Sequence, residues 1–170
     1  MNNKIAILGI VEIISAISIG IFILSITYKL VTWFGKKYYD ISEKTSAFSV
    51  FTASILFSVG YLVSGVIQPL ISSFRLLNTQ ESAWLVAGKY LGMGAVYITI
   101  AFISALMIGL LSTYLYSRLT PIDEWKEIKE NNWGVALIVS AIVITLTLMS
   151  KSGVILIIES LIPYPELPPI

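Results

Sequence analysis

Long apolar runs constrain this chain more than any other feature of its sequence. The first run, Ile5 to Tyr28, has 24 residues. As a helix it would extend about 36 Å at 1.5 Å per residue, whereas the hydrocarbon core of a bilayer is roughly 30 Å thick. The run therefore predicts a transmembrane helix. It is also longer than the roughly 7 to 15 apolar residues of a cleavable signal peptide, so we expect it to be retained.

Three further runs predict three more spans. They cover, in order, Ala47 to about Val66, Tyr90 to Tyr116, and a stretch that begins at Trp133. We expect this last span to end at Met149, because Ser150–Gly153 interrupt the apolar run and a helix continued to Leu161 would measure about 43 Å. The predicted fold class is an all-α membrane protein with four transmembrane helices.

The residues after Lys151 predict a short interfacial or re-entrant C-terminal segment. The tail that follows, PYPELPPI, is not expected to be helical, because each Pro lacks an N–H group and restricts the residue before it.

The two halves of the chain share a layout and three short matches. The matching pairs are Thr27-Tyr28 with Thr113-Tyr114, Asp40–Glu43 with Glu127–Glu130, and Ser64–Val66 with Ser152–Val154. Their offsets of 86, 87 and 88 residues fit a tandem duplication followed by small insertions. Since each unit holds two spans, the copies would point the same way, as a parallel repeat. We predict a first two-span repeat in residues 1–70, an outer loop in 71–89, and a second repeat with the tail in 90–170.

Cations indicate the orientation. Seven Lys or Arg residues belong to the first and third loops, and four belong to the other side. The seven are Lys29, Lys36, Lys37, Lys44, Arg118, Lys126 and Lys129, and the four are Lys4, Arg75, Lys89 and Lys151. Because cytoplasmic loops carry the excess of Lys and Arg, we expect both termini outside, in the cytoplasmic (inner) membrane of a prokaryote.

Composition excludes several classes of function. Eleven Lys and Arg face ten Asp and Glu, which is not the basic surface of a nucleic-acid-binding protein. The sequence has no Cys and no His, so thiolate catalysis, the commonest metal ligand and the commonest general base are missing. We expect no catalytic residues, no metal and no cofactor.

Glu12 is the ionisable residue inside the first span. A charge near the bilayer centre costs roughly 2.5 to 3.5 kcal/mol on insertion scales. Glu12 shares a helix face with Ala16 and Gly20, so it could point into the bundle as part of an ion path or a polar contact. Alternatively, it lies within a turn of the interface and reaches water, Lys4 or Lys151.

Lys151 and Glu159 flank the last apolar piece. One interpretation places them along a cavity beside a broken helix. The interpretation that we favour is an interfacial segment with Lys151 extending toward the lipid headgroups.

Small residues recur every four positions along two spans. Ala101, Ala105 and Gly109 form one such stripe, and Ala16 and Gly20 form another. Such stripes let helix backbones approach closely, so they predict helix packing, either within the bundle or between subunits.

The loop before the last span, residues 121–132, predicts a short amphipathic helix. Asp123 and Glu124 stand near its start, as the helix dipole prefers, and Asn132 is placed to cap the following span. We favour a solvated helix or a docking surface for a cytoplasmic partner over an acid/base or Mg²⁺ site, since no second polar cluster supplies further groups.

The stretch from Pro121 to Ala136 resembles the signature of a bacterial membrane family, domain of unknown function 350. The match falls on Pro121, Asp123, Glu124, Ile128, Asn132 and Ala136. The sequence departs from the family pattern at Ile122, where an aromatic residue is usual, at Asn131, where Gly is usual, and at Trp133-Gly134. The resemblance implies two tandem two-span units. It implies no catalytic residues, because the family has no established activity.

These features predict a non-enzymatic structural or accessory subunit of a membrane complex. Its partners would be the lipid bilayer, other membrane subunits or copies of itself. The alternative is a small ion-conducting channel or transporter subunit with a polar path near Glu12 and Lys151. A membrane enzyme acting on lipid is a third possibility.

Overall fold

The structure is a computed structural model that describes residues 3–42, 45–67, 69–70 and 83–162. The side chains of residues 3–12, 14–16, 83, 86–87 and 90 also lie outside the description. In this part of the chain the helices are α1 (Asn3–Tyr39), α2 (Ser46–Ser64), α4 (Ala83–Leu119), α5 (Glu124–Lys129) and α6 (Trp133–Glu159).

Four of these helices are long and apolar enough to cross a membrane. Within the described residues the candidate spans are Ile17–Tyr39, Ser46–Ser64, Leu91–Leu119 and Trp133–Glu159. The protein is therefore an all-α, multi-pass membrane protein, as the apolar runs predict.

The first and third spans begin or end outside their predicted limits. Helix α1 continues past Tyr28 to Tyr39, so Lys36 and Lys37 lie in its last turn rather than in a loop. Cations are favourable there because the C-terminal end of a helix carries partial negative charge. Helix α4 begins at Ala83, so the last residues of the predicted outer loop are helical.

The predicted interruption of the last span is wrong. Helix α6 runs without a break through Ser150–Gly153 to Glu159. Its 27 residues extend about 40 Å, a length that a tilted helix accommodates. Continuity satisfies the backbone hydrogen bonds that a break would expose to lipid. The interfacial or re-entrant segment expected after Lys151 is thus part of α6 up to Glu159, and the Pro-rich tail, residues 163–170, lies outside the described residues.

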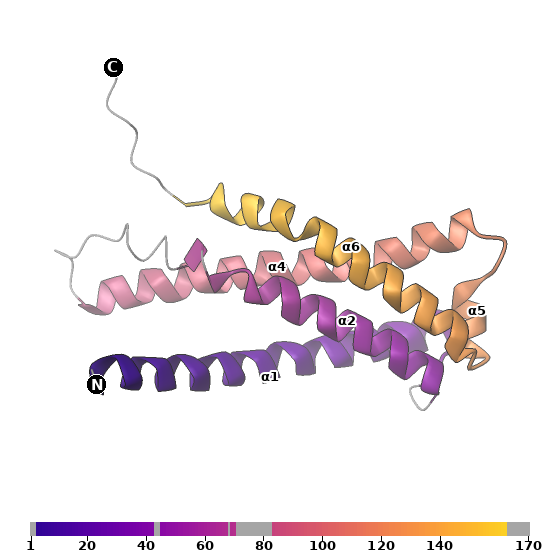
Figure 1. Ribbon diagram of the computed structural model, residues 1–170, viewed down its shortest axis with the longest axis horizontal. Coiled ribbons are helices and arrows are strands. Elements are labelled where there is room, and N and C mark those ends of the chain that lie inside the picture. The colour runs from indigo at the N-terminus through magenta and orange to yellow at the C-terminus, as the bar shows by residue number, and fades with distance from the viewer. Residues whose placement is uncertain (1–2, 43–44, 68, 71–82, 163–170) are drawn as a thin grey trace, which may run out of the picture.

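The four long helices form two hairpins that point the same way. Helices α1 and α4 run toward the end of the molecule that holds α5, called here the α5 end, and α2 and α6 run back from it (Figure 1). The hydroxyl of Ser140 donates to the Val50 carbonyl oxygen at 3.3 Å, and that of Thr147 donates to Ser58 Oγ at 2.9 Å. These partners are 90 and 89 residues apart, so α2 and α6 pack in parallel and in register. The duplication itself stays a prediction.

The core lies around α2, which packs against α6, α4 and α1. Buried α2 residues recur at helical spacing, including Phe48, Phe51, Ile55 and Val59. Across the interface, α4 and α6 contribute Ala101, Ala105, Val139 and Val143 to the same core.

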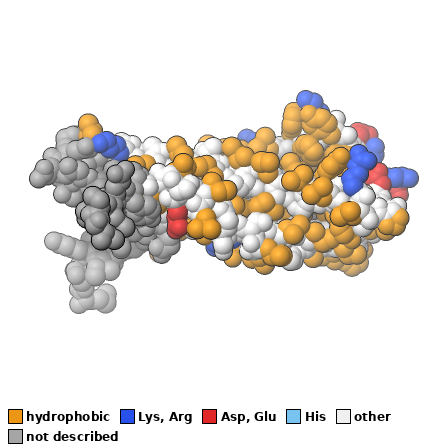
Figure 2. Space-filling view, turned by 90° about the horizontal axis from the view of Figure 1, so that it is seen from above, with side chains coloured by type: hydrophobic (Ala, Val, Ile, Leu, Met, Phe, Trp, Pro, Cys, Tyr) orange, Lys and Arg blue, Asp and Glu red, His pale blue; other side chains and the backbone are white. Residues whose placement is uncertain are grey.

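The outer surface is apolar along its length and charged at the α5 end. Figure 2 shows Lys, Arg, Asp and Glu side chains gathered chiefly at that end, with hydrophobic side chains along the molecule. Exposed Ile17, Phe22, Met107 and Met149 belong to this apolar surface, which a bilayer would cover.

Candidate functional site

Helix α5 closes the charged end of the bundle, and its capping follows from its sequence. The Asp123 side chain accepts a hydrogen bond from the Lys126 N–H at 3.2 Å, which satisfies a free donor of the first turn. Trp125 and Ile128 are buried beneath the helix. Pro121 and Asp123 are exposed, as a helix start at the membrane surface allows.

Glu124 is buried, unlike Lys126 and Lys129 of the same helix, whose side chains are exposed as a solvated helix predicts. Only 2% of its surface is exposed. Its Oε1 accepts a hydrogen bond from the Thr120 hydroxyl, whereas Oε2 has no hydrogen-bond partner among the described residues. The pattern of acids and lysines did not reveal this burial, because an amphipathic helix of six residues leaves the depth of its packing undefined.

Two asparagines connect α5 to the two helices that return from this end. Asn132 caps α6, as predicted: its Oδ1 accepts from the Val135 N–H at 3.3 Å, and its Nδ2 donates to Glu127 Oε2 at 2.8 Å. Asn131 caps α2 from a distant part of the chain, because its Oδ1 accepts from the Ala47 N–H at 3.0 Å. This contact could not be predicted from the sequence, because Asn131 and Ala47 are 84 positions apart.

An aromatic cluster holds α5 against α1. The rings of Tyr39 and Trp125 stack with centroids 4.2 Å apart and an interplanar angle of 12°. Phe34 and Phe51 contact the same indole, with centroids at 6.0 Å and 5.2 Å. The cluster links Trp125 to residues 74 to 91 positions away in the chain, so no local sequence pattern indicates it.

Three hollows surround the Tyr39–Trp125 stack. The first, of about 440 Å³, is an apolar groove between α1 and α4. The second, of about 350 Å³, holds Ser117, Arg118 and Thr120, and the third, of about 400 Å³, holds Lys37, Lys126 and Lys129. Tyr39 and Trp125 line all three, so an apolar hollow and two hollows with cationic side chains adjoin the same aromatic pair.

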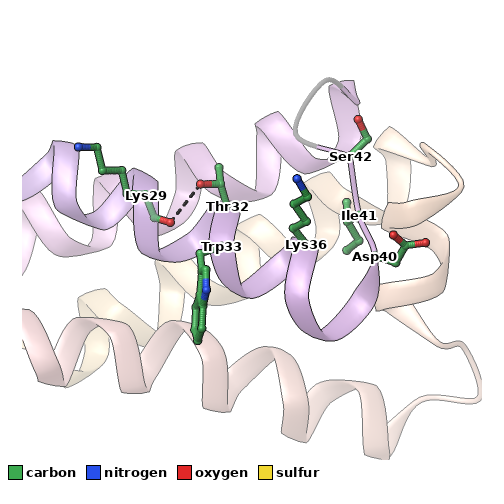
Figure 3. A pocket seen from close by; sticks show the side chains of 7 residues that line it. All are labelled: Lys29, Thr32, Trp33, Lys36, Asp40, Ile41 and Ser42. Carbon is green, nitrogen blue, oxygen red and sulfur yellow. Dashed lines mark hydrogen bonds between the residues drawn. The ribbon is translucent and has the colours of Figure 1, made fainter.

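A fourth hollow, of about 470 Å³, lies along the end of α1. Its lining residues are Lys29, Thr32, Trp33, Lys36, Asp40, Ile41 and Ser42 (Figure 3). The first four are spaced along one stretch of α1, and the last three follow the point where the chain leaves the helix. Asp40 adopts φ 52°, a left-handed conformation that Asp tolerates better than most residues, and this turns the chain back toward α2.

Of the three predicted intramembrane polar residues, Lys151 and Glu159 lie in the part of the chain whose side chains are described. The Glu12 side chain lies outside the described residues, and so does that of Ala16. The Lys151 ammonium lies 3.9 Å from the centroid of the Tyr61 ring, a cation–π contact with α2. Glu159 is half-buried and is the last residue of α6.

The two predicted small-residue stripes differ in their surroundings. Ala101 and Ala105 are fully buried, and a side-chain carbon added at Gly109 would overlap Cδ1 of Ile55. This stripe therefore packs inside the bundle. By contrast, an added carbon at Gly20 would meet no atom within 4 Å.

A family model described as Domain of Unknown Function (DUF350) matches residues 5–154. The chain belongs to this family. No curated protein and no solved structure matches it. Two positions of the stretch that resembles the family signature, Ile128 and Ala136, are fully buried, which explains why apolar residues are needed there.

The structure also explains one departure from the family pattern. The family resemblance implies Gly at position 131, and Asn131 adopts φ 65°, a left-handed conformation in which Gly is unstrained and Asn is among the better alternatives. In this DUF350 chain the Asn side chain adds the cap on α2 that a Gly would not supply.

Proposed function

We propose that this protein is a non-enzymatic structural or accessory subunit of a membrane complex, held to its partners through α1. The supporting observation is the open surface at Gly20. Exposed glycines in transmembrane helices allow close backbone contact with a neighbouring helix. Gly109 has such a neighbour inside the chain, whereas Gly20 has none within 4 Å.

The packing of α1 agrees with this role. Helix α1 packs against α2 and α5, with its closest approach near the α5 end, where a carbon added at Gly35 would lie 2.8 Å from the Phe48 ring. Farther from that end, Ile13, Ile17 and Ile21 are 56 to 63% exposed. Ile13, Ile17 and Gly20 follow the spacing of one helix face, which is the surface that we assign to a partner subunit.

The orientation follows the predicted charge bias. The α5 end carries Lys36, Lys37, Arg118, Lys126 and Lys129, so we place it in the cytoplasm of a prokaryote, with both termini outside. The exposed charges of α5 are then available to a cytoplasmic partner.

The test is the composition of the native assembly. The protein is extracted in mild detergent at its native expression level, and the mass of the particle and its polypeptides are measured. We expect different polypeptides in a fixed ratio, lost in Gly20→Leu but kept in Gly153→Leu, a control at which an added side chain also meets nothing within 4 Å.

Other outcomes would redirect the proposal. Recovery as a monomer would contradict it. Recovery as a closed homo-oligomer, together with ion flux in liposomes that Glu12→Gln changes, would favour a conducting subunit instead.

A further inference from the structure

The groove between α1 and α4 has the length of one leaflet. It follows α4 from Ile103 through Met107 and Leu110 to Tyr114, and Phe34 of α1 lines its other side. Tyr114 follows Ile103 by eleven residues, which is about 16 Å along a helix. This length is about half of the roughly 30 Å hydrocarbon core. Its volume of about 440 Å³ lies within the range of ligand pockets, and its lining is almost wholly apolar.

The groove ends at a polar and cationic rim. Tyr39, Tyr114 and Trp125 line both the groove and the neighbouring hollow that contains Ser117, Arg118 and Thr120. Tyr39 and Trp125 also line the hollow that contains Lys37, Lys126 and Lys129, and these two hollows form the rim. A molecule in the groove would therefore have its apolar part beside α4 and its polar end beside Arg118, at the depth where helix α5 begins. A phospholipid in the leaflet at the α5 end has the same arrangement, with its acyl chains in the apolar layer and its phosphate at the level of the rim.

Two cations of this rim have no carboxylate in ion-pair distance among the described residues. Lys129 binds Asp40 at 3.1 Å, and Lys126 lies 3.9 Å from Glu130. By contrast, the Arg118 guanidinium lies 5.3 Å from the Tyr114 ring centroid, and the Lys37 ammonium lies 4.6 Å from that of Trp33.

Asp123 lines the same hollow as Arg118, and its carboxylate accepts a hydrogen bond from the Lys126 N–H at the start of α5. Of the cations, Arg118 is the one in this hollow, and guanidinium groups bind phosphate with paired hydrogen bonds.

We propose that this groove binds one acyl chain of an anionic phospholipid, whose phosphate is held at the rim by Arg118, while Lys37 adds positive charge from the adjoining hollow. A second copy of the chain is the less favourable occupant. In the same membrane orientation its own cations would lie at the same depth as Arg118, and like charges repel each other. The lipid site lies on the α4 side of the Tyr39–Trp125 stack and is separate from the face around Gly20, so it does not depend on the proposed subunit contact.

The experiment uses the full chain in nanodiscs that contain equal amounts of phosphatidylglycerol and phosphatidylcholine. Lipids that stay bound after release into mild detergent are counted by native mass spectrometry. We expect the wild type to retain one phosphatidylglycerol per chain. The double variant Lys37→Gln/Arg118→Gln should lower its affinity about tenfold or more, because each cation near an anionic lipid contributes substantially to binding.

Two further variants separate the site from general attraction to basic protein. Met107→Trp fills the groove at a position that is 60% exposed, so it disturbs the fold little, and it should abolish retention. Lys29→Gln/Lys36→Gln removes the same number of charges from the fourth hollow, whose lining includes neither Arg118 nor Lys37, and should leave retention unchanged. Equal retention of both lipids by the wild type would overturn the proposal, as would equal losses in the two double variants or full retention by Met107→Trp.

Discussion

Replacement of Gly109 by Ala tests whether α4 packs into the bundle through its small-residue stripe. Gly109 is buried, and the added methyl group would overlap Cδ1 of Ile55 while lying 3.8 Å from Cγ1 of Val143. Ile55 and Val143 are themselves fully buried, so the Ile55 side chain cannot move aside without displacing other core groups. Overpacking of this kind typically costs about 1 to 3 kcal/mol.

Gly92→Ala is the matched control on the same helix. A methyl group at Gly92 meets no atom within 4 Å. Both substitutions change the intrinsic helix preference by the same amount, about 0.5 to 1 kcal/mol in favour of Ala. This contribution cancels when the two variants are compared, so the difference between them isolates the packing term. We expect Gly109→Ala to be less stable than Gly92→Ala by about 1 to 3 kcal/mol.

The assay is equilibrium unfolding in mixed micelles with increasing dodecyl sulfate, followed by circular dichroism and tryptophan fluorescence. The midpoint and slope give the free energy of unfolding for each variant. If the two variants had equal stability, α4 would not contact α2 at Gly109, and the reasoning would be refuted.

Two other substitutions test the connections between the hairpins in the same assay. Asn131→Ala should lower the free energy of unfolding by about 1 to 3 kcal/mol, because it removes the acceptor for the Ala47 N–H and places Ala in a left-handed conformation. Asn131→Gly should cost less, since it keeps access to that conformation, and equal costs would contradict this explanation. Thr147→Val removes the hydrogen bond to Ser58 and should cost about 0.6 kcal/mol, the average for such bonds in membranes. A double-mutant cycle with Ser58→Ala that showed no coupling would contradict the interhelical bond.

The helices and their directions could be predicted from the sequence, because apolar runs of this length have few alternatives in a bilayer. The residues at which the helices begin and end could not be predicted in this way. Helix α1 continues from Lys29 to Tyr39, because the charge of Lys29 ends the apolar run but not the helix. Helix α6 continues through Ser150–Gly153, because the demand for backbone hydrogen bonds outweighs a weak local signal to stop.

The candidate site was predictable only where its interactions are local. Asp123 and Asn132 cap the helices that follow them, as their positions indicate. The Tyr39–Trp125 stack and the bond from Ala47 to Asn131 join residues 86 and 84 positions apart. These contacts depend on how the hairpins assemble, which no local pattern encodes.

The central claim is that a protein, and not lipid alone, covers the α1 face that contains Gly20. A photoreactive amino acid at Ile17 tests it in the native membrane, with Ile138 of α6 as the control, because both side chains are 56% exposed. The account predicts a covalent adduct of defined mass with another polypeptide from position 17 and none from position 138. If neither position gave a protein adduct, lipid alone would cover α1 and the claim would be contradicted.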